Sequence, residues 1–122
     1  MVLLDTSVLI DILRGRTAAL GWLDGLAKPP SLSAVSLMEL HAGCRNRREE
    51  GDIARIERTL KIHPVDAAIA RRAGVFVRLY QASYGLDDID ALIAATAEHH
   101  DVKLATLNVK HFPMFAKLRR PY

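Results

Sequence analysis

Three aspartates lie within four positions in the stretch GLDDIDALIAATA, residues 85–97. Asp87, Asp88 and Asp90 could each start a helix, because a carboxylate at that position accepts hydrogen bonds from the first-turn amides. One of them could instead be directed into a site and bind a metal or a substrate. The residues that follow are apolar on all sides of a helix, so helical phase does not separate Asp88 from Asp90. The spacing alone leaves this question open.

Two further acids lie in apolar surroundings. Asp5 follows the run VLL, at the carboxyl end of an expected first strand. In open α/β sheets that edge faces the ligand crevice, although Asp5 could equally cap the next helix. Glu39 lies in SAVSLMELHAG, where its neighbours at helical spacing are small or apolar. A solvated helix face or a salt bridge to Arg45 is the alternative for Glu39.

Together, these carboxylates at strand and helix ends predict a pocket rich in oxygen ligands. Such ligands suit a hard divalent cation, Mg²⁺ or Mn²⁺, better than zinc. A cation held there can activate water for an in-line attack on a phosphodiester. The five histidines show no zinc-ligand spacing, and isolated ones such as His111 are interpreted as structural. The chain contains no glycine-rich phosphate loop and no Ser/His/Asp arrangement.

Short apolar runs alternate with helical patterns along the chain, which predicts an α/β domain with a mainly parallel sheet. The expected strands are residues 2–4, 32–34, 62 and 103–106. The expected helices are residues 7–14, 17–26 (capped by Thr17), 36–44, 53–60, 66–84 and 88–99. Residues 45–52 are polar and are expected to form an exposed turn, and residues 109–122 an irregular end with at most one short helix.

Length and composition predict one compact domain, residues 1–122, with a hydrophobic content of 50%. The net charge of +3 favours a polyanionic partner such as RNA. Cys44 is the single cysteine, which fits a reducing cytoplasm, and it is expected to be a small buried hydrophobe. The apolar amino terminus is interrupted by Asp5 and Asp11 and has no basic start, so neither a signal peptide nor a membrane span is expected.

Three segments in order resemble a known family: LLDTSVLIDILRG, SAVSLMELHAG and GLDDIDALIAATAEHHDVKLATLNVKHF. The chain resembles PIN-domain ribonucleases, specifically the VapC-type toxins of prokaryotic VapBC toxin–antitoxin pairs. The resemblance implies a PIN-like α/β fold, with a central, mainly parallel sheet of four to five strands flanked by helices. It also implies an acidic metal site at the carboxyl ends of the strands.

The resemblance implies roles for individual acids. Asp5, Glu39 and Asp90 match the family's metal-binding carboxylates, and Asp90 is the aspartate of DALIAATA. Asn108 occupies a fourth polar position, where many relatives have aspartate. Asn108 is therefore expected to position a water or a phosphate rather than to supply charge.

Four more residues receive supporting roles by the same resemblance. Thr6 and Thr106 are expected to be hydroxyl partners of the acids. Asp87 and Asp88 are expected to cap the helix that carries Asp90, with Asp88 as a reserve ligand.

The activity implied is that of a Mg²⁺- or Mn²⁺-dependent endoribonuclease toxin that cuts RNA and inhibits translation and growth. The implied partners are a VapB-like antitoxin, whose carboxyl-terminal segment blocks the site, and a second copy of the chain. Basic side chains are candidates for RNA backbone contacts, although each taken singly fits a solvated surface charge: Arg45, Arg47, Arg48, Lys110, Lys117, Arg119 and Arg120.

Two alternatives remain open at this point. The chain could be a PIN-fold RNA-processing nuclease outside a toxin pair, or a non-catalytic PIN-fold binding module in a regulatory complex. A phosphoacceptor receiver domain and a haloacid-dehalogenase-type phosphatase are both excluded on residues. The first needs an adjacent acidic pair after the first strand, and the second needs an aspartate where Ser7 stands.

Overall fold

A parallel four-stranded sheet forms the centre of the molecule. The computed structural model describes all residues from Met1 to Tyr122. The strands are β1 (Val2–Leu4), β2 (Ser31–Ser33), β3 (Lys61–His63) and β4 (Lys103–Ala105), in the order β3-β2-β1-β4. Every neighbouring pair is parallel, so all four carboxyl ends lie at one edge of the sheet. β1 is central, and Asp5 follows it directly.

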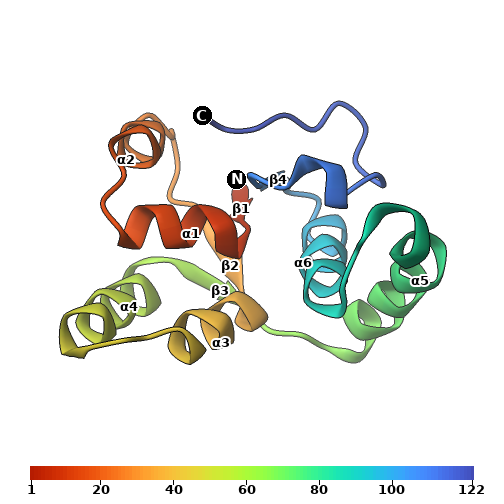
Figure 1. Cartoon of the computed structure of the whole chain (residues 1–122), viewed down its shortest axis with the longest axis horizontal. Coiled ribbons are helices and arrows are strands. Elements are labelled where there is room, and N and C mark those ends of the chain that lie inside the picture. The colour runs from red at the N-terminus through yellow and green to blue at the C-terminus, as the bar shows by residue number, and fades with distance from the viewer.

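Helices connect consecutive strands, as parallel pairing requires. They are α1 (Thr6–Leu13), α2 (Thr17–Asp24), α3 (Ala34–Ala42), α4 (Arg47–Thr59), α5 (Ala67–Tyr84) and α6 (Asp88–His99), followed by the short 3₁₀ helix η1 (Val109–His111). In Figure 1, α1 to α4 gather on one side of the sheet, and α5 and α6 on the other. None of these helices is both long and apolar enough to span a membrane.

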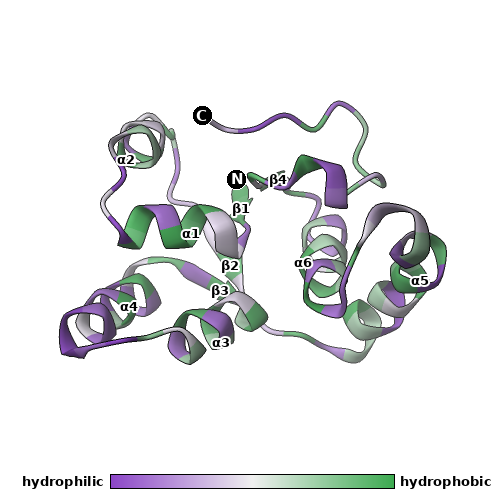
Figure 2. Ribbon diagram, in the orientation of Figure 1, coloured by the Kyte–Doolittle hydropathy of each residue, from purple (hydrophilic) through white to green (hydrophobic).

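Two hydrophobic clusters fill the spaces on either side of the sheet. Neighbouring residues of a strand face opposite sides, so Leu3 packs in the cluster with α5 and α6, whereas Leu4 packs with α1, α3 and α4. Both leucines are fully buried. Figure 2 shows apolar residues in β1 and on parts of the helices, with hydrophilic residues in β3 and on the outer turns of α4. β1 is thereby held from both faces, which gives its carboxyl end a rigid base.

Most of the expected elements are confirmed. The sheet is parallel with four strands, and helix Asp88–His99 has the predicted bounds. The long helix α5 also agrees, with Asp66 as its N-cap. Cys44 is only partly buried, packing at the edge of the cluster with α1, α3 and α4.

The expectation of an exposed turn over residues 45–52 is wrong, because α4 already begins at Arg47. The side chain of Asn46 accepts a hydrogen bond from the Glu49 backbone N–H at 2.9 Å and caps the helix. The polar residues therefore form the first turns of the helix that buries Ile53 and Ile56. The expected cap at Thr17 is also wrong: Arg16 holds that position, and no side chain caps α2.

We predict that Asn46→Ala lowers the free energy of unfolding by about 1 kcal/mol, because the Glu49 amide loses its acceptor. Urea denaturation followed by circular dichroism measures this. Thr17→Ala is the matched control, since Thr17 makes no capping bond, and its effect should stay within about 0.5 kcal/mol. Equal effects of the two substitutions would contradict the cap assignment.

Candidate active site

Asp5 is a buried carboxylate at the centre of the site. The strand β1 ends at Leu4, and Asp5 is the N-cap of α1, with its Oδ1 accepting a hydrogen bond from the Thr6 backbone N–H at 2.9 Å. The residue is only 3% exposed. Asp5 therefore caps α1, one of the two alternatives left open by the sequence, and it does so at the carboxyl end of the central strand.

Two hydroxyl groups complete the hydrogen bonding of Asp5. The Thr106 hydroxyl donates to Oδ2 at 2.6 Å, and the Ser7 hydroxyl donates to the same oxygen at 2.9 Å. Each hydroxyl oxygen then accepts from the backbone beyond β4: Thr106 from the Asn108 N–H, and Ser7 from the Leu107 N–H. A carboxylate this buried requires such partners, since an unpaired buried ion is unfavourable by several kcal/mol. The network fastens the loop after β4 to the start of α1.

Glu39 joins the same network through Thr6. The Thr6 hydroxyl donates to Glu39 Oε1 at 2.5 Å, and the Ser36 hydroxyl lies 2.9 Å from the Thr6 oxygen. Because Thr6 has one hydroxyl proton and gives it to Glu39, Ser36 is the donor in the second contact. Thr6 therefore binds Glu39 with its side chain and Asp5 with its backbone. The expected roles of Thr6 and Thr106 as hydroxyl partners of the acids are confirmed.

Asp90 lies in the first turn of α6 with its side chain 14% exposed. Burial, followed by the charges of Asp87 and Asp5, raises its pKa from 3.8 to about 6. His111 acts in the opposite direction, with its Nδ1 3.3 Å from Asp90 Oδ2. Asp90 thus has an environment that disfavours its negative charge, as a carboxylate near other carboxylates does.

The aspartates of the opening stretch have different positions. Asp87 is the N-cap of α6, and its Oδ1 accepts from the Asp90 backbone N–H at 2.7 Å. Asp88 is the first residue of the helix and is exposed, with no hydrogen bond from its side chain. The expectation that both would cap is therefore correct for Asp87 and wrong for Asp88.

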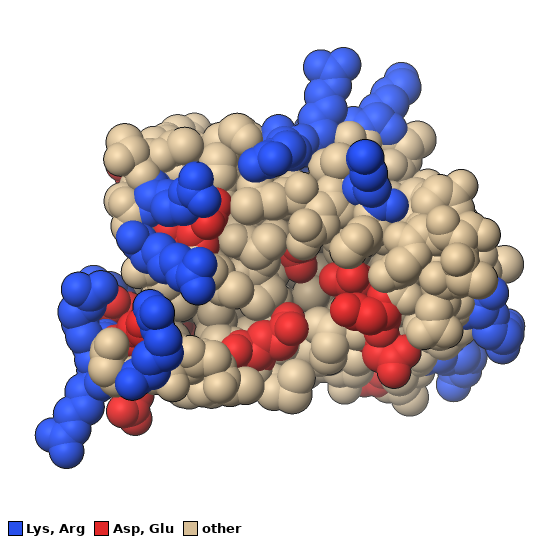
Figure 3. Space-filling view, viewed as in Figure 1, with Lys and Arg blue, Asp and Glu red and all other residues tan.

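Asp5, Glu39 and Asp90 lie at the same edge of the sheet: Thr6 bonds to both Asp5 and Glu39, and the charge of Asp5 acts on Asp90. Figure 3 shows acidic side chains gathered around the recess in the middle of this face, between the two groups of helices. As they stand, no three carboxylates or imidazoles are close enough to ligate one ion together. The donor chemistry still fits Mg²⁺, which keeps several waters and typically takes only one or two protein carboxylates directly. The third acid would then act through a water.

Other candidates lie further out. Asn108 and Lys110 are exposed, and only the Asn108 backbone takes part in the network. Arg45 pairs with Glu49 at 2.8 Å, so the alternative of an Arg45–Glu39 salt bridge is wrong. Arg48 borders a cavity that Glu39 also lines. The remaining basic candidates are exposed: Arg47, Lys117, Arg119 and Arg120.

Sequence reasoning missed three residues of the site. Ser7 and Ser36 each hold an oxygen of the hydroxyl network, and His111 contacts Asp90. The serines had a signal, since Ser7 lies two residues after Asp5 and Ser36 lies three residues before Glu39. His111 had none, because it lies 21 positions after Asp90 and only the fold brings them together.

Comparison with known proteins places this chain in a family. The PIN domain family matches residues 2–118. Ribonuclease VapC10 of Mycobacterium tuberculosis is 44% identical over 125 residues, covering 100% of this chain and 93% of that protein. Ribonuclease VapC19 of the same species is 40% identical over 129 residues, covering 100% of both. The chain belongs to the PIN-domain family, among its VapC-type members.

Solved structures agree. A chain of a toxin–antitoxin complex from Klebsiella pneumoniae superposes with a TM-score of 0.84 at 30% identity, over 100% of this chain and 98% of that one. FitAcB from Neisseria gonorrhoeae gives 0.72 at 29% identity, over 92% and 91%. VapBC2 from Rickettsia felis, bound to a DNA fragment from its promoter, gives 0.76 at 22% identity over 97% and 96%, which supports the fold alone.

The raised pKa of Asp90 predicts a pH-dependent stability. Because the folded pKa is about 6 and the ordinary value 3.8, the fold favours the protonated form. That contribution is fully present below pH 3.8 and is lost as the pH rises through 6. In EDTA, Asp90→Asn should therefore be more stable than the wild type at neutral pH, by on the order of 1 kcal/mol, and this difference should shrink toward pH 4.

Thermal unfolding across this pH range, followed by circular dichroism, measures the difference. Asp88→Asn is the control, because it removes the same charge from an exposed position of the same turn. A gain for Asp90→Asn that does not vary with pH would show that the carboxylate's environment is not its cause.

Proposed function

We propose that this chain is a Mg²⁺- or Mn²⁺-dependent endoribonuclease toxin of a type II toxin–antitoxin pair. The observation that supports the proposal is the proximity of Asp5, Glu39 and Asp90 beside the carboxyl end of the central strand. Two relatives identical at 40% or more over the whole chain are ribonucleases by name. The reaction proposed is hydrolysis of an RNA phosphodiester bond.

The three acids are the proposed ligands, directly or through water. They would hold a divalent cation, which would supply activation of a water and stabilisation of the charge that develops on the phosphate. Asp5 is held by Ser7, Thr106 and the Thr6 amide, so its oxygens have a fixed direction. Such outer contacts orient a carboxylate and tune its affinity for a cation.

Glu39 and Asp90 approach Asp5 from opposite sides of the sheet. Thr6 restrains Glu39, while Asp90 stands on the rigid, buried helix α6, with Asp87 as its cap. Burial, followed by the charges of Asp87 and Asp5, raises the Asp90 pKa, and a positive charge bound beside these acids would offset part of that effect. Asn108, at the exposed edge, is proposed to orient a water or a phosphate oxygen.

The proposed partner is a VapB-like antitoxin that covers this site. The structural neighbours come from toxin–antitoxin complexes, by their descriptions. We further propose a homodimer that acts in the cytoplasm, where RNA is accessible.

The catalytic proposal predicts that purified protein cuts single-stranded RNA with Mg²⁺ or Mn²⁺ and stops on addition of EDTA. Asp90→Asn should lower kcat/KM at least about 100-fold, because a proposed ligand loses its charge. Gel analysis of labelled RNA measures this. Asp88→Asn is the matched control and should cut like the wild type. Cleavage by Asp90→Asn at the wild-type rate, or loss with Asp88→Asn, would refute the assignment.

The toxin proposal predicts that expression in a bacterium slows growth and that co-expression of the antitoxin restores it. Asp5→Asn should remove the growth defect, because a carboxylate at the centre of the site is lost. Growth curves after induction measure this, with immunoblots to show equal protein levels. An unaffected growth rate with the wild-type chain, at full expression, would argue for a role outside a toxin pair.

A further inference from the structure

Beside the acids lies a cavity whose lining includes three arginines and two glutamates. It has a volume of about 150 Å³ and lies between α1, α3 and α4. Its floor is apolar, formed by Ile10, Leu13, Leu40 and Ile53. Glu39 lines it as well, so the cavity adjoins the carboxylate cluster directly.

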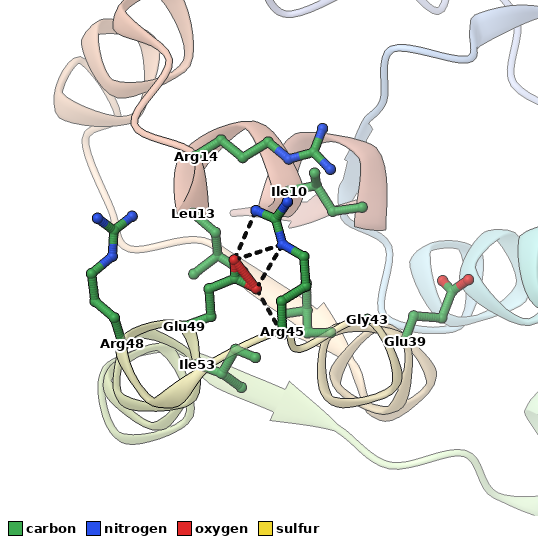
Figure 4. Close-up of a pocket in the computed structure, with 10 residues that line it drawn as sticks. Ile10, Leu13, Arg14, Glu39, Gly43, Arg45, Arg48, Glu49 and Ile53 are labelled. Atoms are coloured by element: carbon green, nitrogen blue, oxygen red, sulfur yellow. Dashed lines mark hydrogen bonds and ion pairs between the residues drawn. The ribbon is translucent and has the colours of Figure 1, made fainter.

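Three arginines from different elements border this cavity. Arg14 is the C-cap of α1, Arg45 lies between α3 and α4, and Arg48 is in the first turn of α4. Arg14 and Arg48 take part in no ion pair or side-chain hydrogen bond, so their guanidinium groups are free to bind an anion. Figure 4 shows Arg14 and Arg45 extending over the cavity, with Arg48 at its outer side.

Arg45 is held in place by Glu49. Its Nε donates to Oε2 at 3.0 Å, its Nη2 donates to Oε2 at 2.8 Å, and its backbone N–H donates to Oε1 at 3.0 Å. This pairing occupies one edge of the guanidinium and leaves the Nη1 edge open, since the group has five N–H donors. Glu49 is 16% exposed and Arg45 68%, so the acid is the anchored member and the arginine faces solvent.

We propose that this cavity is a phosphate subsite for the RNA strand, in which Arg14, Arg45 and Arg48 hold a phosphate next to the scissile one, and Glu49 is a positioning residue for Arg45. The proposal rests on the proposed ribonuclease function. A strand whose scissile phosphate lies among the acids continues past Glu39, and the arginines are the cations it meets there. The acids alone repel RNA, so a flanking cationic subsite supplies the attraction that the carboxylates lack.

The two sites lie at opposite ends of α1, and the helix rises by about 1.5 Å for each residue between them. Thr6 begins that helix among the acids, and Arg14 follows its last turn. The arginines therefore stand beside the carboxylates and not among them, which suits a neighbouring phosphate. An acidic protein segment has a similar charge, but only the RNA strand is required to pass from one site to the other.

The test is binding of a fluorescein-labelled single-stranded RNA oligonucleotide in EDTA, followed by fluorescence anisotropy over a range of salt concentrations. Without divalent cation the readout is independent of cleavage. Arg14→Gln and Arg48→Gln should each weaken binding about three- to tenfold and reduce the slope of log K against log salt by about 0.7. Arg78→Gln, which removes the same charge from an exposed position of α5, is the matched control and should do neither.

Glu49→Gln tests the positioning role. At raised salt, where long-range charge is screened, it should weaken RNA binding about two- to fivefold, because Arg45 loses its fixed orientation. A purely electrostatic role predicts tighter binding, since a negative charge is removed. Tighter or equal binding would therefore overturn the role of Glu49. Arg45→Lys keeps the positive charge but loses the planar guanidinium with its paired N–H donors. This variant should therefore bind RNA more weakly than the wild type.

The outcomes separate the two proposals. If the arginine variants bind RNA like the Arg78→Gln control, the subsite is refuted even when the wild type cuts RNA. If they bind RNA normally but are no longer neutralised by the co-expressed antitoxin, the cavity serves the protein partner and the RNA subsite is refuted. If they weaken binding while the wild type cuts no RNA with any divalent cation, the subsite stands and the hydrolytic function fails.

Discussion

The buried carboxylate of Asp5 is the constraint on which the rest of the site depends. A charge that is 3% exposed at the end of a central strand is tolerated only when its oxygens are fully hydrogen-bonded. Its partners come from the first turn of α1 and from Thr106 after β4, which lies 101 positions away. Satisfying this one group fixes how the two ends of the domain meet.

Because the sheet is parallel, the segments that follow different strands lie beside Asp5 at one edge. β1 lies between β2 and β4, so the segments following all three strands reach the same edge. α3 brings Glu39 from one side, and α6 brings Asp90 from the other. The arrangement disfavours the negative charge of Asp90, whose pKa is raised first by burial and then by the charges of Asp87 and Asp5. The free energy of folding is therefore less favourable while Asp90 is charged, which is common where acidic groups cluster at functional sites.

Charge is segregated over short distances around the same edge. The carboxylates lie in the recess, whereas basic side chains lie over α4 and along the carboxyl-terminal segment in the same view (Figure 3). Glu39 belongs to both regions, since it is bound to Thr6 and also lines the arginine-bordered cavity. A polyanion that lies across both regions would be attracted by the basic side chains and would reach the carboxylates in the recess.

The sequence by itself determined the elements and their order. Helical periodicity and capping residues defined α5 and α6, and alternating strands and helices predicted the parallel sheet, because these signals act between neighbouring residues. The family motifs pointed to Asp5, Glu39 and Asp90, where periodicity could not choose between Asp88 and Asp90. Only the tertiary structure decided which hydroxyls hold the acids, that His111 contacts Asp90, and that Arg45 pairs with Glu49 and not with Glu39. The Thr106–Asp5, Thr6–Glu39 and His111–Asp90 contacts join residues far apart in the chain, and no local pattern encodes them; the Arg45–Glu49 pair depends on where α4 begins, which its polar first turns concealed.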